Sequence, residues 1–159
     1  MGVLVAAVRK ALEDDGWPVW DTDEPDVIAS AYQGENTLIV CVAQCGDDDR
    51  FLVFYSFCPL EVPPQRRMAV AEFLMRANHQ MRLGNFEMDF EDGEVRFKTS
   101  LDTDGADLTP AMVRNLIAPN VLAMDRYVPG IALVLNEEET PGEAVRLVEE
   151  GRIDEEATN

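Results

Sequence analysis

Apolar residues among the first fifteen positions recur at the spacing of one helix face. Residues 2–15 therefore predict an amphipathic helix, and Gly16 can end it because glycine readily adopts a left-handed backbone conformation. The next ten residues, 17–26, contain two prolines and predict an irregular connecting segment. We expect Trp17 and Trp20 to cover the edge of the core from this segment.

Three runs of strand-forming residues follow at hairpin spacing, over residues 27–33, 37–45 and 51–58. The second and third runs are apolar on both faces: Leu38, Val40 and Val42 alternate with Ile39, Cys41 and Ala43, and Phe51, Val53, Tyr55 and Phe57 alternate with Leu52, Phe54 and Cys58. An antiparallel sheet usually leaves one face polar and in contact with water. The second face of this sheet must therefore be covered by a C-terminal helix of the same chain, by a second copy or by a bound partner.

Residues 64–83 predict a helix that Pro63 and Pro64 open and Gly84 ends. Four arginines against one glutamate give this stretch a charge of 4 − 1 = +3, which is unusual in an acidic chain. Its basic face is suited to an acidic surface of the same fold or of a twin subunit, and its methionines fit either a core or a binding groove. The resulting candidate protein-binding or dimer surface comprises Ile39, Cys41, Leu52, Phe54, Val53, Tyr55, Phe57, Arg66 and Arg67.

A second hairpin is predicted over residues 86–101. Asp92-Gly93 is a favoured two-residue turn, which places Met88 opposite Phe97 and Glu87 opposite Lys98. Opposite charges then face each other on one side of the hairpin and apolar side chains on the other. This hairpin is expected to have one buried and one solvated face.

The last predicted element of the main domain is a helix that Thr109 caps and that extends to about Leu135. Pro119 and Pro129 should kink or interrupt this helix, because proline cannot donate a backbone hydrogen bond. The acidic turn before it, residues 102–107, is interpreted as a solvated loop, since its ligand order does not match a calcium-binding loop.

From Glu137 onward the chain becomes strongly acidic. Residues 142–150 predict a short helix, and residues 151–159 predict a frayed tail. We therefore divide the chain into a domain over residues 1–136 and an acidic C-terminal segment over residues 137–159.

Composition narrows the classes of partner. The chain has 159 residues, of which 47% are apolar, and its 13 basic against 31 acidic side chains give a net charge of −18. This length and apolar content fit one domain with its own core. The charge disfavours direct binding of nucleic acid, since phosphates need cationic partners, and it favours attraction of basic proteins.

Few residues offer catalytic or metal-binding chemistry. Cys41, Cys45 and Cys58 are too few and badly spaced for a disulfide framework, and His79 is the single histidine, so neither a zinc site nor any cofactor is expected. No apolar run is long enough to span a bilayer. We expect a cytoplasmic, non-enzymatic protein without a membrane interaction.

Four short stretches resemble the YbjN-like family of bacterial sensory transduction regulators. They are Phe73-Leu-Met-Arg-Ala-Asn78, Leu83-Gly84-Asn85-Phe86-Glu87-Met88-Asp89, Gly93-Glu-Val-Arg-Phe97, and Asp125-Arg-Tyr127 with Pro129. The resemblance implies an α+β fold in the order α-β-β-β-α-β-β-α, with an antiparallel sheet packed against helices, similar to type III secretion chaperones. It also implies a dimer that binds other proteins, and it supplies no catalytic residues.

Within that resemblance, Asn78, Gly84, Asn85 and Phe86 form a structural motif. Gly84 is expected to end the preceding helix, Asn78 to hydrogen-bond the incoming strand, and Phe86 to enter the core. None of these roles involves a ligand.

Three functions are compatible with the sequence. The first is a homodimeric protein-binding adaptor or chaperone-like regulator whose apolar sheet face binds a protein or peptide client, with an acidic surround that attracts basic ones. The second is a polyanion mimic that binds a basic nucleic-acid-binding protein. The third is an enzyme that uses paired carboxylates.

Overall fold

The computed structural model describes residues 2–46, 48, 50–79 and 81–153. These residues form an α+β fold, as expected, with one antiparallel sheet and helices. The elements in chain order are α1 (Val3–Asp14), β1 (Val19–Asp21), β2 (Val27–Gln33), β3 (Leu38–Gly46), β4 (Phe51–Phe57), the 3-10 turn η1 (Pro64–Arg66), α2 (Arg67–Asn78), β5 (Asn85–Met88), β6 (Val95–Asp102), α3 (Pro110–Leu135) and α4 (Pro141–Glu150).

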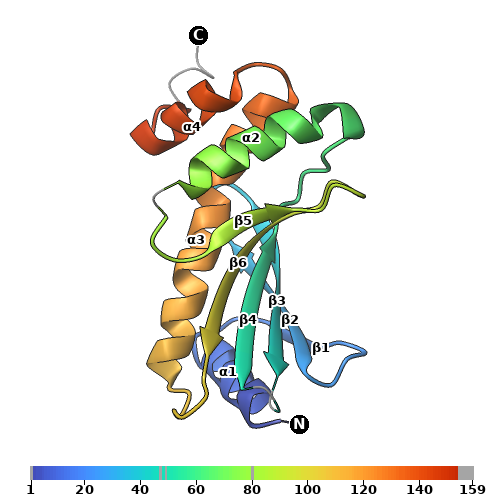
Figure 1. Cartoon of the computed structure of the whole chain (residues 1–159). Helices are drawn as coiled ribbons and strands as arrows, with labels where there is room; N and C mark the ends of the chain where they lie inside the picture. Colours follow the sequence, from blue (N-terminus) through green and yellow to red (C-terminus); the bar gives the residue numbers. More distant parts are fainter. Residues whose placement is uncertain (1, 47, 49, 80, 154–159) are drawn as a thin grey trace.

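The six strands lie in the order β1-β2-β3-β4-β6-β5, and every neighbouring pair is antiparallel. The short strands β1 and β5 are therefore the two edges. α3 extends along the length of the sheet, while α2 and α4 lie across one end and α1 lies toward the other (Figure 1).

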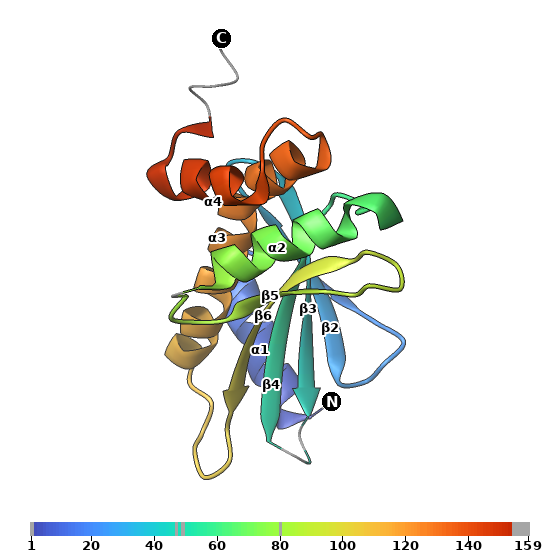
Figure 2. The same ribbon diagram turned by 45° about the horizontal axis from the view of Figure 1, so that its top comes forward.

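α1 and α3 cover the same face of the sheet. α1 contacts β2 and β3, and α3 contacts β3, β4 and β6. In Figure 2 the strands lie in front of both helices. The predicted apolar face of α1 is buried here through Leu4, Val5, Val8, Ala11 and Leu12. The core consequently lies between this helical layer and one face of the sheet, which we call the covered face.

α3 is one continuous helix of 26 residues, so of the two expected effects of Pro119 and Pro129, a kink or an interruption, the interruption does not occur. A proline in a helix leaves the carbonyl four residues earlier without its usual donor. For Pro129 that carbonyl belongs to Asp125, and the side-chain amide of Asn36 donates to it at 3.0 Å. The tertiary structure thus replaces the hydrogen bond that Pro129 removes.

α2 ends at Asn78, five residues before the predicted end of this helix. The side chain of Asn78 instead bonds the backbone of β5, as described below. Gly84, at φ +74°, lies beyond the helix, where a Cβ would come within 2.6 Å of the Lys98 carbonyl oxygen. Its role is therefore the close approach of the chain to β6, and the prediction that Gly84 ends the helix is wrong.

The second hairpin has the predicted faces but a different register. Phe86 lies opposite Phe97, and Met88 lies opposite Val95, a shift of two residues from the predicted pairing. The connection spans Asp89 to Glu94 instead of two residues, and the Arg67 guanidinium holds it by donating to two of its carbonyl groups. Because the shift is even, each side chain keeps its face.

Two further elements complete the comparison with the sequence. The segment predicted as irregular contains β1, whose three residues are too few for a clear period. The predicted short C-terminal helix is present as α4, with Ala144, Val145, Leu147 and Val148 buried against α2 and α3. The frayed tail predicted over residues 151–159 lies mostly outside the described residues.

Candidate protein-binding surface

The second face of the sheet, which we call the open face, carries apolar side chains from four strands: Trp20 from β1; Val27, Ala29 and Ala31 from β2; Leu38, Val40 and Val42 from β3; and Val53, Tyr55 and Phe57 from β4. Among the described residues, no helix packs on this face. Trp20, Leu38 and Val40 are 50–56% exposed, whereas Ile39 and Cys41 on the other side of β3 are 0% exposed.

The strand register aligns the open-face side chains in rows across the sheet. One row consists of Trp20, Ala29, Val42, Tyr55 and Lys98, in that order from the β1 edge. Since directly opposed side chains in a sheet contact one another, this row is a continuous strip from the indole of Trp20 to the ammonium group of Lys98. The face thus offers apolar area with a polar border, as protein interfaces commonly do.

Charged side chains of β5 and β6 form that border. The Arg96 guanidinium lies 4.4 Å from the centre of the Tyr55 ring and bonds Glu87 at 2.9 Å, and Lys98 pairs with the same carboxylate. Burial alone would raise the pKa of Glu87, but the hydrogen bonds from Lys98 and Arg96 outweigh it and lower that pKa below its ordinary value. The two cations and one carboxylate are therefore fixed in place beside the apolar strip.

The structure divides the predicted surface residues between the two faces. Val53, Tyr55 and Phe57 lie on the open face, where a partner can reach them. Ile39, Cys41, Leu52 and Phe54 are at most 1% exposed and lie beneath α1 and α3. These four residues belong to the core, because the chain's own helices occupy the space that the sequence left open for a partner.

Arg66 and Arg67 are engaged within the chain. Arg66 donates to the Val134 carbonyl near the C-terminal end of α3 and pairs with Glu137 at 3.0 Å. Arg67 donates to the carbonyl groups of Phe90 and Glu91. Both therefore bind acidic or carbonyl groups of the same fold, which was one of the two uses expected for this basic stretch.

The motif residues behave largely as the resemblance implies. Asn78 accepts a hydrogen bond from the Phe86 backbone N–H at 2.6 Å and donates to the Phe86 carbonyl at 3.1 Å. Phe86 is 4% exposed and packs edge-on against Phe97 and Tyr127. The Asn85 side chain donates to the same Phe86 carbonyl. Asn78 thus occupies the backbone N–H and carbonyl of Phe86 on the edge strand β5, which leaves fewer groups of this edge for an added strand.

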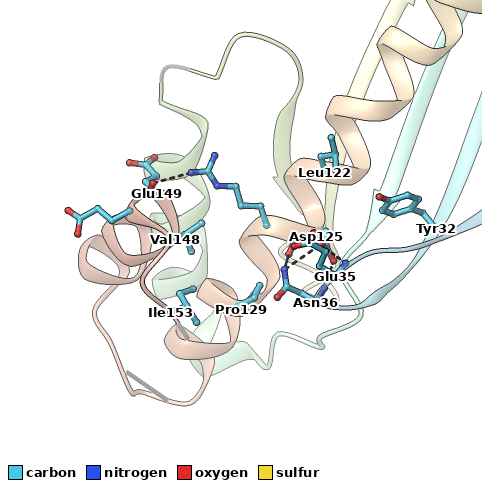
Figure 3. Close-up of a pocket in the computed structure, with 12 residues that line it drawn as sticks. Tyr32, Glu35, Asn36, Leu122, Asp125, Pro129, Val148, Glu149 and Ile153 are labelled. Carbon is cyan, nitrogen blue, oxygen red and sulfur yellow. Dashed lines mark hydrogen bonds between the residues drawn. The ribbon is translucent and has the colours of Figure 1, made fainter. Parts of the chain in front are cut away.

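Asp125 connects two elements of the fold, a role that was not predicted from the sequence. Its carboxylate accepts hydrogen bonds of 3.0–3.1 Å from the backbone N–H groups of Glu35, Asn36 and Thr37. Figure 3 shows Asp125 pointing toward this turn between β2 and β3. Gly34 is required beside it, since a Cβ there would clash with the carboxylate. Asp125 lies in one of the family-like stretches, but only the fold shows that it joins α3 to the sheet.

The cleft around Asp125 has a volume of about 560 Å³ and contains four carboxylates and one guanidinium, that of Arg126. Arg126 donates to the Glu149 carbonyl. The pKa of Glu150, at the same cleft, is lowered by hydrogen bonds from Arg146 and Arg152. The Asp125 carboxylate accepts from three backbone N–H groups, which suits a structural role.

Two cysteine thiols are held in their protonated form by their surroundings. Burial raises the pKa of Cys41 to about 12. Burial also raises the pKa of Cys58, to about 11, against a hydrogen bond with the Leu60 backbone that lowers it. Both thiols are therefore poor nucleophiles near neutral pH.

The described part of the chain contains neither a candidate metal site nor a candidate membrane-spanning helix. Within residues 2–46, 48, 50–79 and 81–153, no group of three or more His, Cys, Asp or Glu side chains is placed to hold a metal ion. Over the same residues, no helix combines the length and apolar character needed to cross a membrane.

The fold of this chain is similar to that of chains in two solved complexes. A chain of the ExsC–ExsE complex is similar in fold, with a TM-score of 0.50 and 12% identity over 80% of this chain and 95% of that chain. A chain of the HopA1–SchA chaperone–effector complex is also similar, at a TM-score of 0.48 and 12% identity over 75% of this chain and 88% of that chain. The expected likeness to the fold of type III secretion chaperones is confirmed.

The sequence gives the family itself. Residues 4–133 match the YbjN family, described as "Putative bacterial sensory transduction regulator", and the chain belongs to that family. The crystal structure of YbjN, "a putative transcription regulator from E. coli", is similar at a TM-score of 0.55 and 13% identity over 84% of this chain and 90% of that chain. A comparison with curated protein sequences finds no match. The structural identities are low, so these structures establish the shared fold alone.

Proposed function

We propose that this chain is a non-enzymatic regulator that acts as a homodimer and binds a partner protein on the open face of its sheet. The observation that carries the proposal is the apolar strip from Trp20 through Val42 to Tyr55, which no helix of the described residues covers. Exposed apolar patches of this kind on a soluble domain commonly mark interaction sites. The family description and the chaperone-like fold support the same interpretation.

The proposed occupant of the open face is a partner polypeptide that is neutral or basic. Two copies of this chain meeting through their open faces would bring together two bodies that each carry a net charge of −18. A neutral or basic partner avoids this repulsion and is attracted by the acidic surround. Because Asn78 occupies the Phe86 backbone groups at the β5 edge, we expect the partner to lie across the face and not to extend the sheet at β5.

Self-association is proposed through the outer side of α2. Met68 and Met75 are exposed there at 73% and 70%, two helical turns apart on one side of the helix. Glu72 and Arg76 lie beside them and pair within the chain at 2.7 Å. Across a twofold axis the same residues can pair between copies, and this basic stretch is where two acidic chains repel each other least.

The experiment uses a photocrosslinking amino acid in the full chain, placed at Tyr55 on the open face or at Glu13 on the far side of α1. We expect a specific partner to be crosslinked from position 55 and not from position 13. The purified partner should then bind the unmodified chain directly, and Val40→Asp, which places a charge on the open face, should weaken that binding at least tenfold. Binding that survives Val40→Asp would overturn the proposed surface.

Salt dependence separates this function from the polyanion mimic. A mimic should lose affinity steeply as salt is added, whereas burial of apolar area should be affected little. Light scattering of the wild type and of Met75→Glu tests the dimer: the wild type should be dimeric and the variant monomeric. A monomeric wild type would contradict the dimer without affecting the partner-binding face.

A further inference from the structure

A second cleft of about 580 Å³ lies on the helical side of the molecule, between α3 and the loop that connects α2 to β5. Its lining is mixed: Met81, Leu83 and Leu122 are apolar, whereas His79, Tyr127 and Glu149 are polar or charged. Two arginines, Arg82 and Arg126, lie at its margin, and we call it the arginine cleft. Since α3 covers the opposite face of the sheet, this cleft is separate from the open face.

Residues from the family-like stretches lie beside the arginine cleft. Asn78 and Gly84, on either side of Arg82 in the sequence, are held by the hydrogen bonds to Phe86 and by the close approach to β6. Asp125 fixes α3 to the sheet one residue before Arg126. The motif residues that looked purely structural therefore also position the side chains of this cleft.

Arg82 is exceptional among the cations of the chain. It is exposed and makes no hydrogen bond or ion pair with the residues that the structure describes. Every other lysine and arginine makes at least one such contact. A cation that makes no ion pair with the described residues has its donors available for a ligand.

Arg126 provides a second guanidinium that is already oriented. It donates to the Glu149 carbonyl at 3.2 Å, and its charged group lies 5.7 Å from the centre of the Tyr127 ring. The Glu149 carboxylate is itself engaged, because the Tyr127 hydroxyl donates to it at 3.3 Å. Among the described residues, Arg126 makes no other hydrogen bond, so its remaining donors are available.

We propose that the arginine cleft binds an acidic side chain of a partner polypeptide together with the apolar residue next to it. The planar donor fork of arginine matches a carboxylate, which two donors can hold at once. Leu83 and Leu122, which are 60% and 56% exposed, supply the apolar contact. A polynucleotide is disfavoured because the net charge of −18 repels a polyanion, whereas one or two carboxylates are screened over about 8 Å at physiological salt.

Fluorescence anisotropy tests the proposal with a labelled ten-residue peptide in which two aspartates flank a Leu-Phe pair. A second peptide has asparagines in place of the aspartates. We expect the full chain to bind the acidic peptide and Arg82→Gln to weaken that binding about tenfold or more. The asparagine peptide should bind more weakly by a similar factor.

Arg114→Gln is the matched control, since it removes the same charge from α3 outside the cleft. It should change the affinity less than twofold. Equal losses in Arg114→Gln and Arg82→Gln would show a general charge effect and overturn the proposal, as would the absence of binding by the acidic peptide. Val40→Asp on the open face should leave peptide binding intact, so failure of this proposal and failure of the proposed function are distinguishable.

Discussion

The two faces of the sheet are built from the same strands and are almost equally apolar, yet one is buried under helices and the other is open. On β4, Phe54 is 1% exposed beneath α3, whereas its neighbours Val53 and Tyr55 face away from every described helix. Composition does not distinguish the two faces. The difference lies in which face the helices α1 and α3 reach, so an apolar strand face becomes core or interface according to its cover.

α4 packs on α2 and α3 and so supports the helical layer. Deleting residues 137–159 removes α4 and exposes the parts of α2 and α3 on which Ala144, Val145, Leu147 and Val148 pack. We expect the free energy of unfolding to fall by about 5 kcal/mol, because burial of Val145, Leu147 and Val148 contributes about 1.5 kcal/mol each. Chemical denaturation measures it. An unchanged stability would show that residues 1–136 form a complete domain, as the sequence suggested.

The direct test of the comparison replaces one phenylalanine on each face of β4. Phe54→Ala should cost about 4 kcal/mol, since it leaves a cavity in the core. Phe57→Ala should cost about 1 kcal/mol, because that ring stays partly in water before and after folding. Urea denaturation of both variants gives the difference. Equal losses would mean that the open face is covered in solution.

A smaller effect is expected where the helical layer is tied to the sheet. Asp125→Ala leaves the backbone N–H groups of Glu35, Asn36 and Thr37 without their acceptor, and we expect a loss of about 3 kcal/mol. Glu35→Gln is the control, since it removes a nearby carboxylate and keeps the backbone donor. Thermal unfolding of the two variants should therefore differ clearly, and a similar stability would contradict the anchoring role of Asp125.

The smallest effect concerns the charged border of the open face. Because the folded-state pKa of Glu87 is lowered, its stabilising contribution is present above its ordinary pKa of 4.5 and is lost as the pH falls through the lowered value. Glu87→Gln should cost about 1 kcal/mol at neutral pH and nothing at low pH. Denaturation across that range, with the exposed Glu94→Gln as control, measures this. A pH-independent cost would contradict the assignment.

The sequence predicted the helices and strands well where the spacing of apolar residues clearly followed one period. The boundaries of β2, β3 and β4 fall within one residue of expectation, and the buried side chains of α1 are those that the helical period selects. Weak or conflicting local signals gave the errors. Pro119 and Pro129 argued against a continuous α3, and Asp92-Gly93 argued for a turn shorter than the one that Arg67 stabilises from another element.

The candidate site was predicted in composition but not in geometry. The strands β3 and β4 were identified as apolar on both faces, and alternation separated the two sets of side chains correctly. Which set is accessible depends on where α1 and α3 pack, and strand periodicity carries no information about that. For the same reason Arg66 and Arg67 were assigned to a surface, because no local pattern indicates their partners. Arg66 binds Val134 and Glu137, and Arg67 binds the second hairpin.

By itself, the sequence determined the fold class, the order of the main elements, the family and the surplus of negative charge, because periodicity, turn residues and motifs are local properties of the chain. Only the tertiary structure decided which sheet face stays open, that Asp125 holds the turn after β2, and that Arg82 alone among the cations makes no hydrogen bond or ion pair with the described residues. These features arise between segments far apart in the sequence. They depend on packing and on the pairing of distant polar groups, which no local pattern specifies.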